Sequence, residues 1–143
     1  MIEDLLILHE GLRLTPYHCT TGKLTIGIGR NLEDTGITEA EARHLLRNDL
    51  QRLRRALPAG FVGWERLGPV RRAVLTDMAY NVGVAGLLGF RKLRTALALR
   101  DWPEAARQML DSRWATQVGE RAHRLARMME TDRWPPELER SST

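Results

Sequence analysis

Apolar and polar positions alternate with a two-residue period in a short segment near the start of the chain. In the run LTIGIG, residues 24–29, the three apolar side chains share one parity, whereas Thr25 and two glycines share the other. The alternation predicts a β-strand with one face toward a core and a second face of almost bare backbone. Turn residues at 20–23 extend the prediction to a β-hairpin over about residues 14–28.

Helical spacing replaces this alternation elsewhere. A short amphipathic segment ending at Glu10 predicts a first helix. Thr38 and Glu41 have the spacing of a capping box, and the apolar positions after them recur at helical intervals until Pro58 and Gly60. They predict a long helix over about residues 38–57, with this apolar stripe: Ala42, Leu45, Leu46, Leu50, Leu53 and Leu57.

Several shorter helices are predicted in the second half of the chain. One begins near Pro69 and is interrupted by the glycines of residues 83–89, and Asp101 caps another. The last follows Gly119 and buries Ala122, Leu125, Ala126 and Met129. The Pro-Pro pair at 135–136 ends the ordered chain, and the tail beyond it is expected to fray.

Composition adds limits rather than an identity. A chain of 143 residues with 43% hydrophobic content can form one substantial core. Its 22 basic and 18 acidic residues give a net charge of +4, which favours approach to anionic polymers and would suit a cell wall or a nucleic acid equally. The start, MIEDLLILHEG, is neither a basic-headed secretory signal nor a membrane span, and one cysteine fits synthesis in a reducing cytoplasm.

Candidate chemistry gathers around the glycine-punctuated strand. Glu10 offers a carboxylic acid and Thr25 a hydroxyl that can hold water, beside a surface with few side chains. Two glycines on one face of a strand indicate the close approach of a ligand, or otherwise a bend or bulge in the hairpin. The pattern suggests a site that cleaves a polysaccharide.

The segment HEGLRLTPYHCTTGKLTIGIGRNL resembles the catalytic segment of phage lysozymes, the endolysins of glycoside hydrolase family 24. Members of that family carry Glu, eight residues, usually Asp, five residues and then Thr, a spacing that selects Glu10, Cys19 and Thr25 here. The resemblance continues through VRRAVLTDMAYNVGVAGLLGF, RDWPEAA and SRWATQVGERAHR.

The resemblance implies a lysozyme-like α+β fold, mainly α, in a single domain over 1–143. Its expected parts are a first helix (1–12) packing on the C-terminal lobe, a hairpin lobe (13–37), a connecting helix (38–57) and a helical lobe (58–143). A cleft between the two lobes would hold an extended glycan.

Cys19 is the departure from the family pattern. An inverting glycosidase needs one carboxylic acid to protonate the leaving oxygen and a second group to activate water. A cysteine thiolate can act as base or as nucleophile, and nearby cations such as Lys23 and Arg30 would lower the pKa of the thiol. Three roles therefore stay open: thiolate base acting with Thr25, thiolate nucleophile, or bystander. The first is our working interpretation.

Further site residues follow only from the resemblance. Three positions match substrate-contacting residues of the family: Asn31, Tyr80 and Gln108. Tyr80 could equally be a core aromatic. Arg121 matches an arginine that reaches the catalytic glutamate, so it would orient Glu10, and Trp114 and Trp134 are interpreted as core anchors.

The implied activity is that of a muramidase, which hydrolyses the β-1,4 bond between N-acetylmuramic acid and N-acetylglucosamine in bacterial peptidoglycan, with Glu10 as general acid. The resemblance implies a bacteriolytic, monomeric enzyme without metal or cofactor, without nucleic-acid binding and without stable membrane insertion. It would be made in the host cytoplasm and reach the periplasmic wall through holes that a holin makes. Whether the anomeric centre inverts stays open.

Two rival interpretations belong to other classes. His9, Glu10, His18 and Cys19 are plausible zinc ligands, although HEGLR is not the H-E-x-x-H spacing. Alternatively, the chain is a non-catalytic module, either a weakened lysozyme fold that binds peptidoglycan or a basic helical protein that binds nucleic acid.

Overall fold

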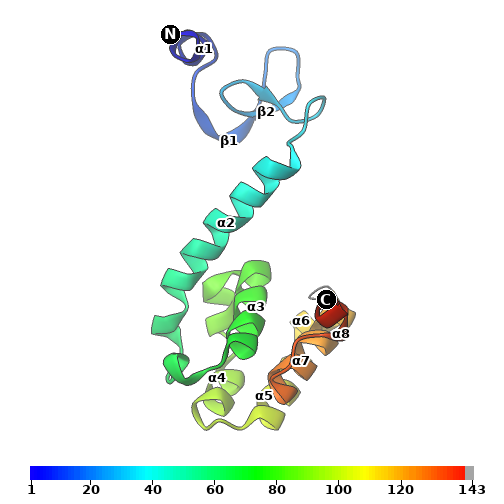
Figure 1. The fold of residues 1–143 in the computed structure, drawn as a ribbon. Coiled ribbons are helices and arrows are strands. Elements are labelled where there is room, and N and C mark those ends of the chain that lie inside the picture. The colour runs from blue at the N-terminus through cyan, green and yellow to red at the C-terminus, as the bar shows by residue number, and fades with distance from the viewer. Residues whose placement is uncertain (141–143) are drawn as a thin grey trace. The chain divides into compact units, whose positions relative to one another are not determined.

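A computed structural model describes residues 1–140 of the chain (Figure 1). Contacts divide the chain into two compact units, Met1–Leu46 and Arg47–Thr143. The division falls inside one long helix. The first unit contains the first helix and the sheet, and the second unit contains the helices that follow the long one.

The first unit consists of a helix, a small sheet and the start of the long helix (Figure 1). Its elements are α1 (Ile2–Glu10), β1 (Arg13–His18), β2 (Leu24–Gly27), β3 (Arg30–Asn31) and the first half of α2 (Glu39–Ala56). The strands form an antiparallel sheet in the order β1-β2-β3. The predicted first helix and hairpin are confirmed, and β3 is an additional strand that the alternation did not predict.

The two glycines end the alternation that predicted the strand. Gly27 and Gly29 have φ angles of +72° and +67°, in the left-handed region that favours glycine. The strand therefore turns after Gly27, and Ile28 lies 44% exposed in the turn instead of facing a core. The buried residue of β2 is Thr25, with 3% exposure, so the predicted apolar face is wrong and a bend at the glycines is correct.

The start of α2 forms the predicted capping box. Thr38 Oγ1 accepts from the backbone N–H of Glu41 at 3.1 Å, and Glu41 Oε1 accepts from the N–H of Thr38 at 3.0 Å. Arg30 also donates to Glu41 Oε1, at 3.0 Å, which joins β3 to the first turn of the helix. Of the residues in the predicted apolar stripe, only the last one, Leu57, is fully buried.

The second unit is built from helices around one apolar core. After 3₁₀ turns at Pro58–Gly60 and Trp64–Arg66, the helices are α3 (Pro69–Leu88), α4 (Arg91–Ala98), α5 (Trp102–Leu110), α6 (Arg113–Val118), α7 (Glu120–Thr131) and α8 (Pro136–Glu139). Helix α5 packs against α4 and α7, and α3 packs against α7. The largest fully buried side chains are Leu57, Leu75, Met78, Leu87, Leu93, Met109, Met129 and Val74.

Most of the helix starts, caps and breaks that were predicted for this unit are confirmed. Helix α3 is kinked at Gly83, which has non-helical φ and ψ of 82° and 160°. The carboxylate of Asp101 caps α5 by accepting from the N–H of Glu104 at 3.2 Å. Helix α7 starts after Gly119 and buries the four predicted apolar residues.

Two predictions for this unit are wrong. The Pro-Pro pair does not end the ordered chain, because α8 begins at Pro136 and Glu137 accepts a hydrogen bond from Arg124 at 3.2 Å. Trp114 is a core residue with 4% exposure, but Trp134 is 43% exposed and no core anchor.

In residues 1–140, no single helix is long and apolar enough to cross a membrane. The two helices α3 and α4 meet the length and composition criteria only as a pair, which is bent by 95°.

Candidate active site

Glu10 is the last residue of α1, and its side chain lies against the turn between β2 and β3. A Cβ atom at Gly29 would stand 2.5 Å from Glu10 Oε2 and 2.8 Å from its carboxyl carbon, closer than side chains tolerate. Gly11 ends the helix with a φ of +77° and donates its N–H to the carbonyl of Ile7. The carboxyl group thus occupies space that only a glycine at position 29 leaves open.

Thr25 lies in the middle strand of the sheet. It is directly opposite Tyr17 of β1 on one side and Asn31 of β3 on the other, so the three side chains share one face. The Thr25 hydroxyl donates to the carbonyl of Lys23 at 2.9 Å. Because its one proton is used there, the Thr25 oxygen is left as an acceptor.

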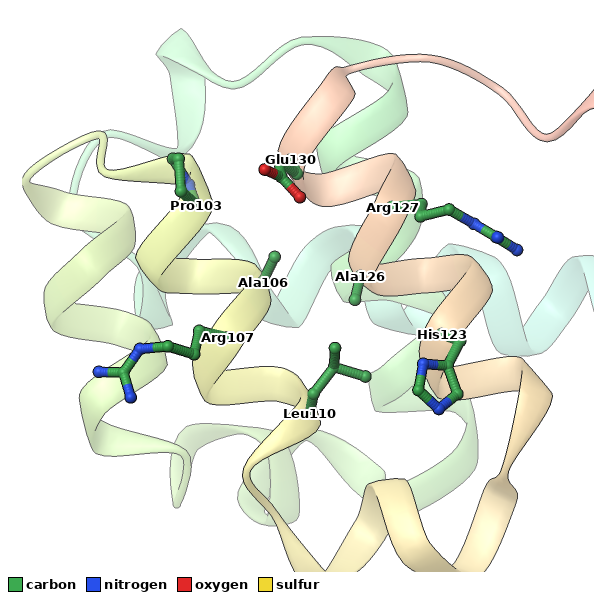
Figure 2. A pocket seen from close by; sticks show the side chains of 8 residues that line it. All are labelled: Pro103, Ala106, Arg107, Leu110, His123, Ala126, Arg127 and Glu130. Atoms are coloured by element: carbon green, nitrogen blue, oxygen red, sulfur yellow. The ribbon is translucent and has the colours of Figure 1, made fainter.

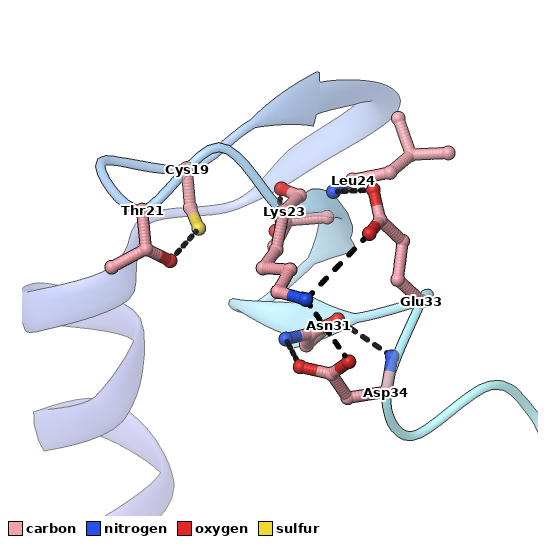
Figure 3. Close-up of polar contacts among 8 residues, drawn as sticks. Cys19, Thr21, Lys23, Leu24, Asn31, Glu33 and Asp34 are labelled. Atoms are coloured by element: carbon pink, nitrogen blue, oxygen red, sulfur yellow. Dashed lines mark hydrogen bonds and ion pairs between the residues drawn. The ribbon is translucent and has the colours of Figure 1, made fainter.

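Cys19 begins the tight turn between β1 and β2. Its N–H donates to the carbonyl of Lys23 at 2.9 Å, and its carbonyl accepts from the N–H of Gly22 at 2.8 Å. Gly22 has a φ of +81°, as expected for the glycine of a short hairpin loop. The Cys19 sulfur lies 3.1 Å from the hydroxyl oxygen of Thr21, inside the turn (Figure 3).

The turn stabilises the thiolate of Cys19. Its pKa falls from the ordinary 9.0 to about 7, chiefly because the Thr21 hydroxyl hydrogen-bonds to the sulfur. Backbone N–H groups of Thr21 and Lys23 lower the pKa further, burial opposes them, and the Thr25 hydroxyl makes the smallest contribution. Near neutral pH about half of the Cys19 side chains therefore carry a negative charge.

The expectation that cations lower this pKa is wrong. The Lys23 ammonium pairs with Asp34 at 3.4 Å and with Glu33 at 3.9 Å (Figure 3). Arg30 donates to the carbonyl of Gly36 at 3.2 Å and to Glu41. Both cations are thus engaged by other groups, and hydrogen-bond donors inside the turn replace them.

Asn31 belongs to the same polar cluster. Its side-chain N–H₂ donates to Asp34 at 2.9 Å, and its carbonyl oxygen accepts from the backbone N–H of Asp34 at 3.0 Å (Figure 3). Glu33 accepts from the N–H of Leu24 at 3.0 Å. The segment after β3 is therefore fixed beside the strand that carries Thr25, and Asn31 is placed by Asp34.

The remaining predicted residues lie in the second unit. Tyr80 on α3 is half exposed, so it is not a core aromatic. Gln108 on α5 donates to Glu104 at 2.8 Å and lines a pocket of about 250 Å³ with residues 89–93 and residues 111–112. Arg121 on α7 donates to the carboxylate of Asp77 at 2.8 Å and to its carbonyl at 3.3 Å.

Another pocket, of about 310 Å³, lies between α5 and α7 (Figure 2). Its lining residues are Pro103, Ala106, Arg107, Leu110, His123, Ala126, Arg127 and Glu130. None of these eight residues was predicted as a site residue. Within residues 1–140, no three His, Cys, Asp or Glu side chains are grouped so that they could hold a metal ion.

The profile of the phage lysozyme family matches residues 8–130. The chain belongs to the phage lysozyme family. Its alignment with probable T4-type lysozyme 1 of Dictyostelium discoideum extends over 159 residues and is 28% identical. The alignment covers 91% of this chain and 94% of that relative. The chain is also 32% identical over 150 residues to the pre-baseplate central spike protein Gp5 of Enterobacteria phage T4, covering 85% of this chain but only 26% of that longer protein.

Family membership confirms the resemblance on which the fold was predicted. The mainly helical chain with its small three-stranded antiparallel sheet has the lysozyme-like α+β fold. The chain is therefore a glycoside hydrolase of the lysozyme type.

Three polar residues with defined contacts were not predicted from the sequence as site residues. Thr21 follows Cys19 by two positions, and in such a turn its hydroxyl can reach the cysteine sulfur. Asp77 and Asn81 lie one helical turn apart on α3 and bind Arg121 and the indole N–H of Trp114, the latter at 2.8 Å. Their spacing of four residues places both side chains on one face of the helix, and this is the signal that the sequence offers.

Proposed function

We propose that the chain hydrolyses the β-1,4 bond between N-acetylmuramic acid and N-acetylglucosamine in bacterial peptidoglycan. Membership of the phage lysozyme family supports this specific activity. The observation that carries the catalytic assignment is the turn at Cys19, which surrounds the position of the family's aspartate with donors suited to an anion. A second ionised group is therefore available although the carboxylate is absent.

Glu10 acts as the general acid in this mechanism. It gives its proton to the glycosidic oxygen as the bond from that oxygen to the anomeric carbon breaks. Its place against the backbone of Gly29 supports the role, since the carboxyl group has a defined position with no side chain at residue 29 to displace it.

Cys19 and Thr25 act on the attacking water. The thiolate accepts one water proton while the water oxygen bonds to the anomeric carbon, and the Thr25 oxygen accepts a hydrogen bond from the same water. The position of Thr25 supports this role, because its own proton is used by the Lys23 carbonyl and its lone pairs are left for a donor. Direct attack of the sulfur on the anomeric carbon is the competing route.

The remaining assignments extend this proposal. Asn31, Tyr80 and Gln108 contact the glycan, and Arg121 orients Glu10 while Asp77 holds the guanidinium. Peptidoglycan is the partner of a monomeric enzyme, and a holin releases the enzyme from the host cytoplasm to the periplasmic wall.

The test is clearing of peptidoglycan stripped of outer membrane by wild type and four variants. Glu10→Gln abolishes clearing, Cys19→Ser reduces it about 100-fold or more, and Cys19→Asp restores it. Glu3→Gln, another exposed carboxylate of α1, is the matched control and stays active. Mass spectrometry of the released fragments identifies the sugar at the new reducing end, which must be N-acetylmuramic acid.

Other outcomes select the rival interpretations. Full activity of Cys19→Ser makes the thiol a bystander and leaves the chemistry to Glu10 and Thr25. Binding of wild type to sacculi without solubilising them means a non-catalytic module. Loss of activity on adding a chelator indicates metal chemistry.

A further inference from the structure

The turn at Cys19 contains a residue to which no role in the reaction has been assigned. Thr21 places its hydroxyl oxygen 3.1 Å from the Cys19 sulfur, while Cys19 itself is fixed at both backbone ends by Lys23 and Gly22. We propose that Thr21 is a positioning residue that keeps Cys19 ionised through this hydroxyl contact. The inference rests on the proposed function only for its effect on lysis.

The charged groups near the turn do not compete with Thr21 for this role. The charged groups on neighbouring elements are engaged elsewhere: Lys23 with Asp34 and Glu33, and Arg30 with Glu41. Glu10, an acid on α1, lies against Gly29. These cations are therefore not available to stabilise a negative charge on the sulfur.

Competition at Thr25 strengthens the same conclusion. The single proton of the Thr25 hydroxyl is donated to the Lys23 carbonyl at 2.9 Å, so a thiolate can take it only if that bond is given up. Thr21 has no such second acceptor among the contacts of residues 1–140, and its hydroxyl can rotate to donate to the sulfur. Thr21 is therefore the hydroxyl that contributes most when the thiol ionises, and the contribution of Thr25 is small.

A matched set of variants isolates this hydroxyl. Thr21→Val keeps the shape and removes the donor, Thr21→Ser keeps the donor, and Thr20→Val makes the same change at an exposed neighbour in the same loop. The rate of alkylation by iodoacetamide as a function of pH reports the thiolate fraction directly. We expect a midpoint near 7 in wild type, Thr21→Ser and Thr20→Val, and a clearly higher midpoint in Thr21→Val.

Lysis gives the second readout. At a pH well below the midpoint, each unit by which the thiol pKa rises lowers the thiolate fraction about tenfold, and clearing falls with it. In the Cys19→Asp background, the carboxylate is ionised at that pH with or without Thr21. Thr21→Val should therefore reduce clearing at pH about 6 in the cysteine enzyme but leave the Cys19→Asp enzyme unchanged.

Each outcome decides a separate question. An unchanged alkylation midpoint in Thr21→Val overturns the inference, as does an equal loss of clearing in both backgrounds, which would mean a structural role for Thr21. A raised midpoint with unchanged clearing supports the inference about the turn and overturns the role of Cys19 in the proposed function.

Discussion

The carboxylate of Glu10 lies so close to the backbone of Gly29 that no side chain fits at residue 29 while the carboxylate keeps its position. The distance from Oε2 to a Cβ at residue 29 would be 2.5 Å. Gly29 therefore has two functions, since its φ of +67° shapes the turn between β2 and β3 and its missing side chain makes room for the acid.

Gly29→Ala should abolish most of the lytic activity without unfolding the protein. The new methyl group would displace the Glu10 carboxyl, and a shift of about 1 Å in a catalytic group can reduce the rate about 100-fold. Gly27→Ala is the control, because Gly27 has a similar φ of +72° but nothing within 4 Å of its Cβ position. Both variants should lose about 1–2 kcal/mol of unfolding free energy in urea titrations. Equal clearing rates for the two would contradict the role of this contact.

The pH dependence of lysis should carry the signature of the thiol. The rate of Cys19→Asp divided by that of wild type removes any pH dependence that the two enzymes share. Because the Cys19 pKa is about 7 and that of an aspartate about 4, this ratio should fall as the pH rises through about 7 and then level off. The measurement is clearing from about pH 5 to about pH 9. A flat ratio would show that the thiolate does not limit the reaction.

Truncation of two tryptophans of the second unit should lower stability by clearly different amounts. Trp114 is 4% exposed, packs edge-on against Phe90 with ring centroids 6.2 Å apart, and donates to Asn81. Trp114→Ala should therefore lower the free energy of unfolding by about 3–5 kcal/mol. Trp134→Ala removes a 43% exposed ring and should lower it by about 1 kcal/mol or less. Similar losses in urea titrations would refute this distinction.

Glu41→Gln should destabilise the protein only where the carboxylate is ionised. The Thr38 N–H and then the Arg30 guanidinium hold the pKa of Glu41 at about 2, below its ordinary 4.5. A depressed pKa contributes stability that is present above pH 4.5 and is lost as the pH falls through about 2. The urea midpoints of wild type and variant should converge over that window, since glutamine keeps the capping geometry. Glu39→Gln, which removes only an exposed pair with Arg43, should show a smaller difference at neutral pH.

Features that depend on a few consecutive residues were predictable from the sequence. The capping box at Thr38 and the cap at Asp101 need only three residues of spacing, and both form as predicted. The start of α7 after Gly119 follows equally from local chemistry. Such signals survive because tertiary packing does not compete with them.

The candidate site was harder to predict, for physical reasons. Alternation could not show that Gly27 and Gly29 take positive φ angles, so Ile28 was placed on the wrong side of the strand. Sequence proximity suggested Lys23 as the group that tunes Cys19, but its long side chain reaches Glu33 and Asp34 instead. The contact between Arg121 and Asp77 joins residues 44 positions apart, which a single sequence does not reveal.

One carboxylate at the start of α2 couples two kinds of secondary structure. Glu41 accepts from Thr38 in the capping box and from Arg30 in β3, so the helix terminus and the edge strand share a single acceptor. Opening of either element removes one of the two hydrogen bonds to this carboxylate. We therefore expect amide hydrogen exchange in the first turn of α2 and in β3 to proceed through one common opening event. These two segments would form a cooperative unit that does not include β1 and β2.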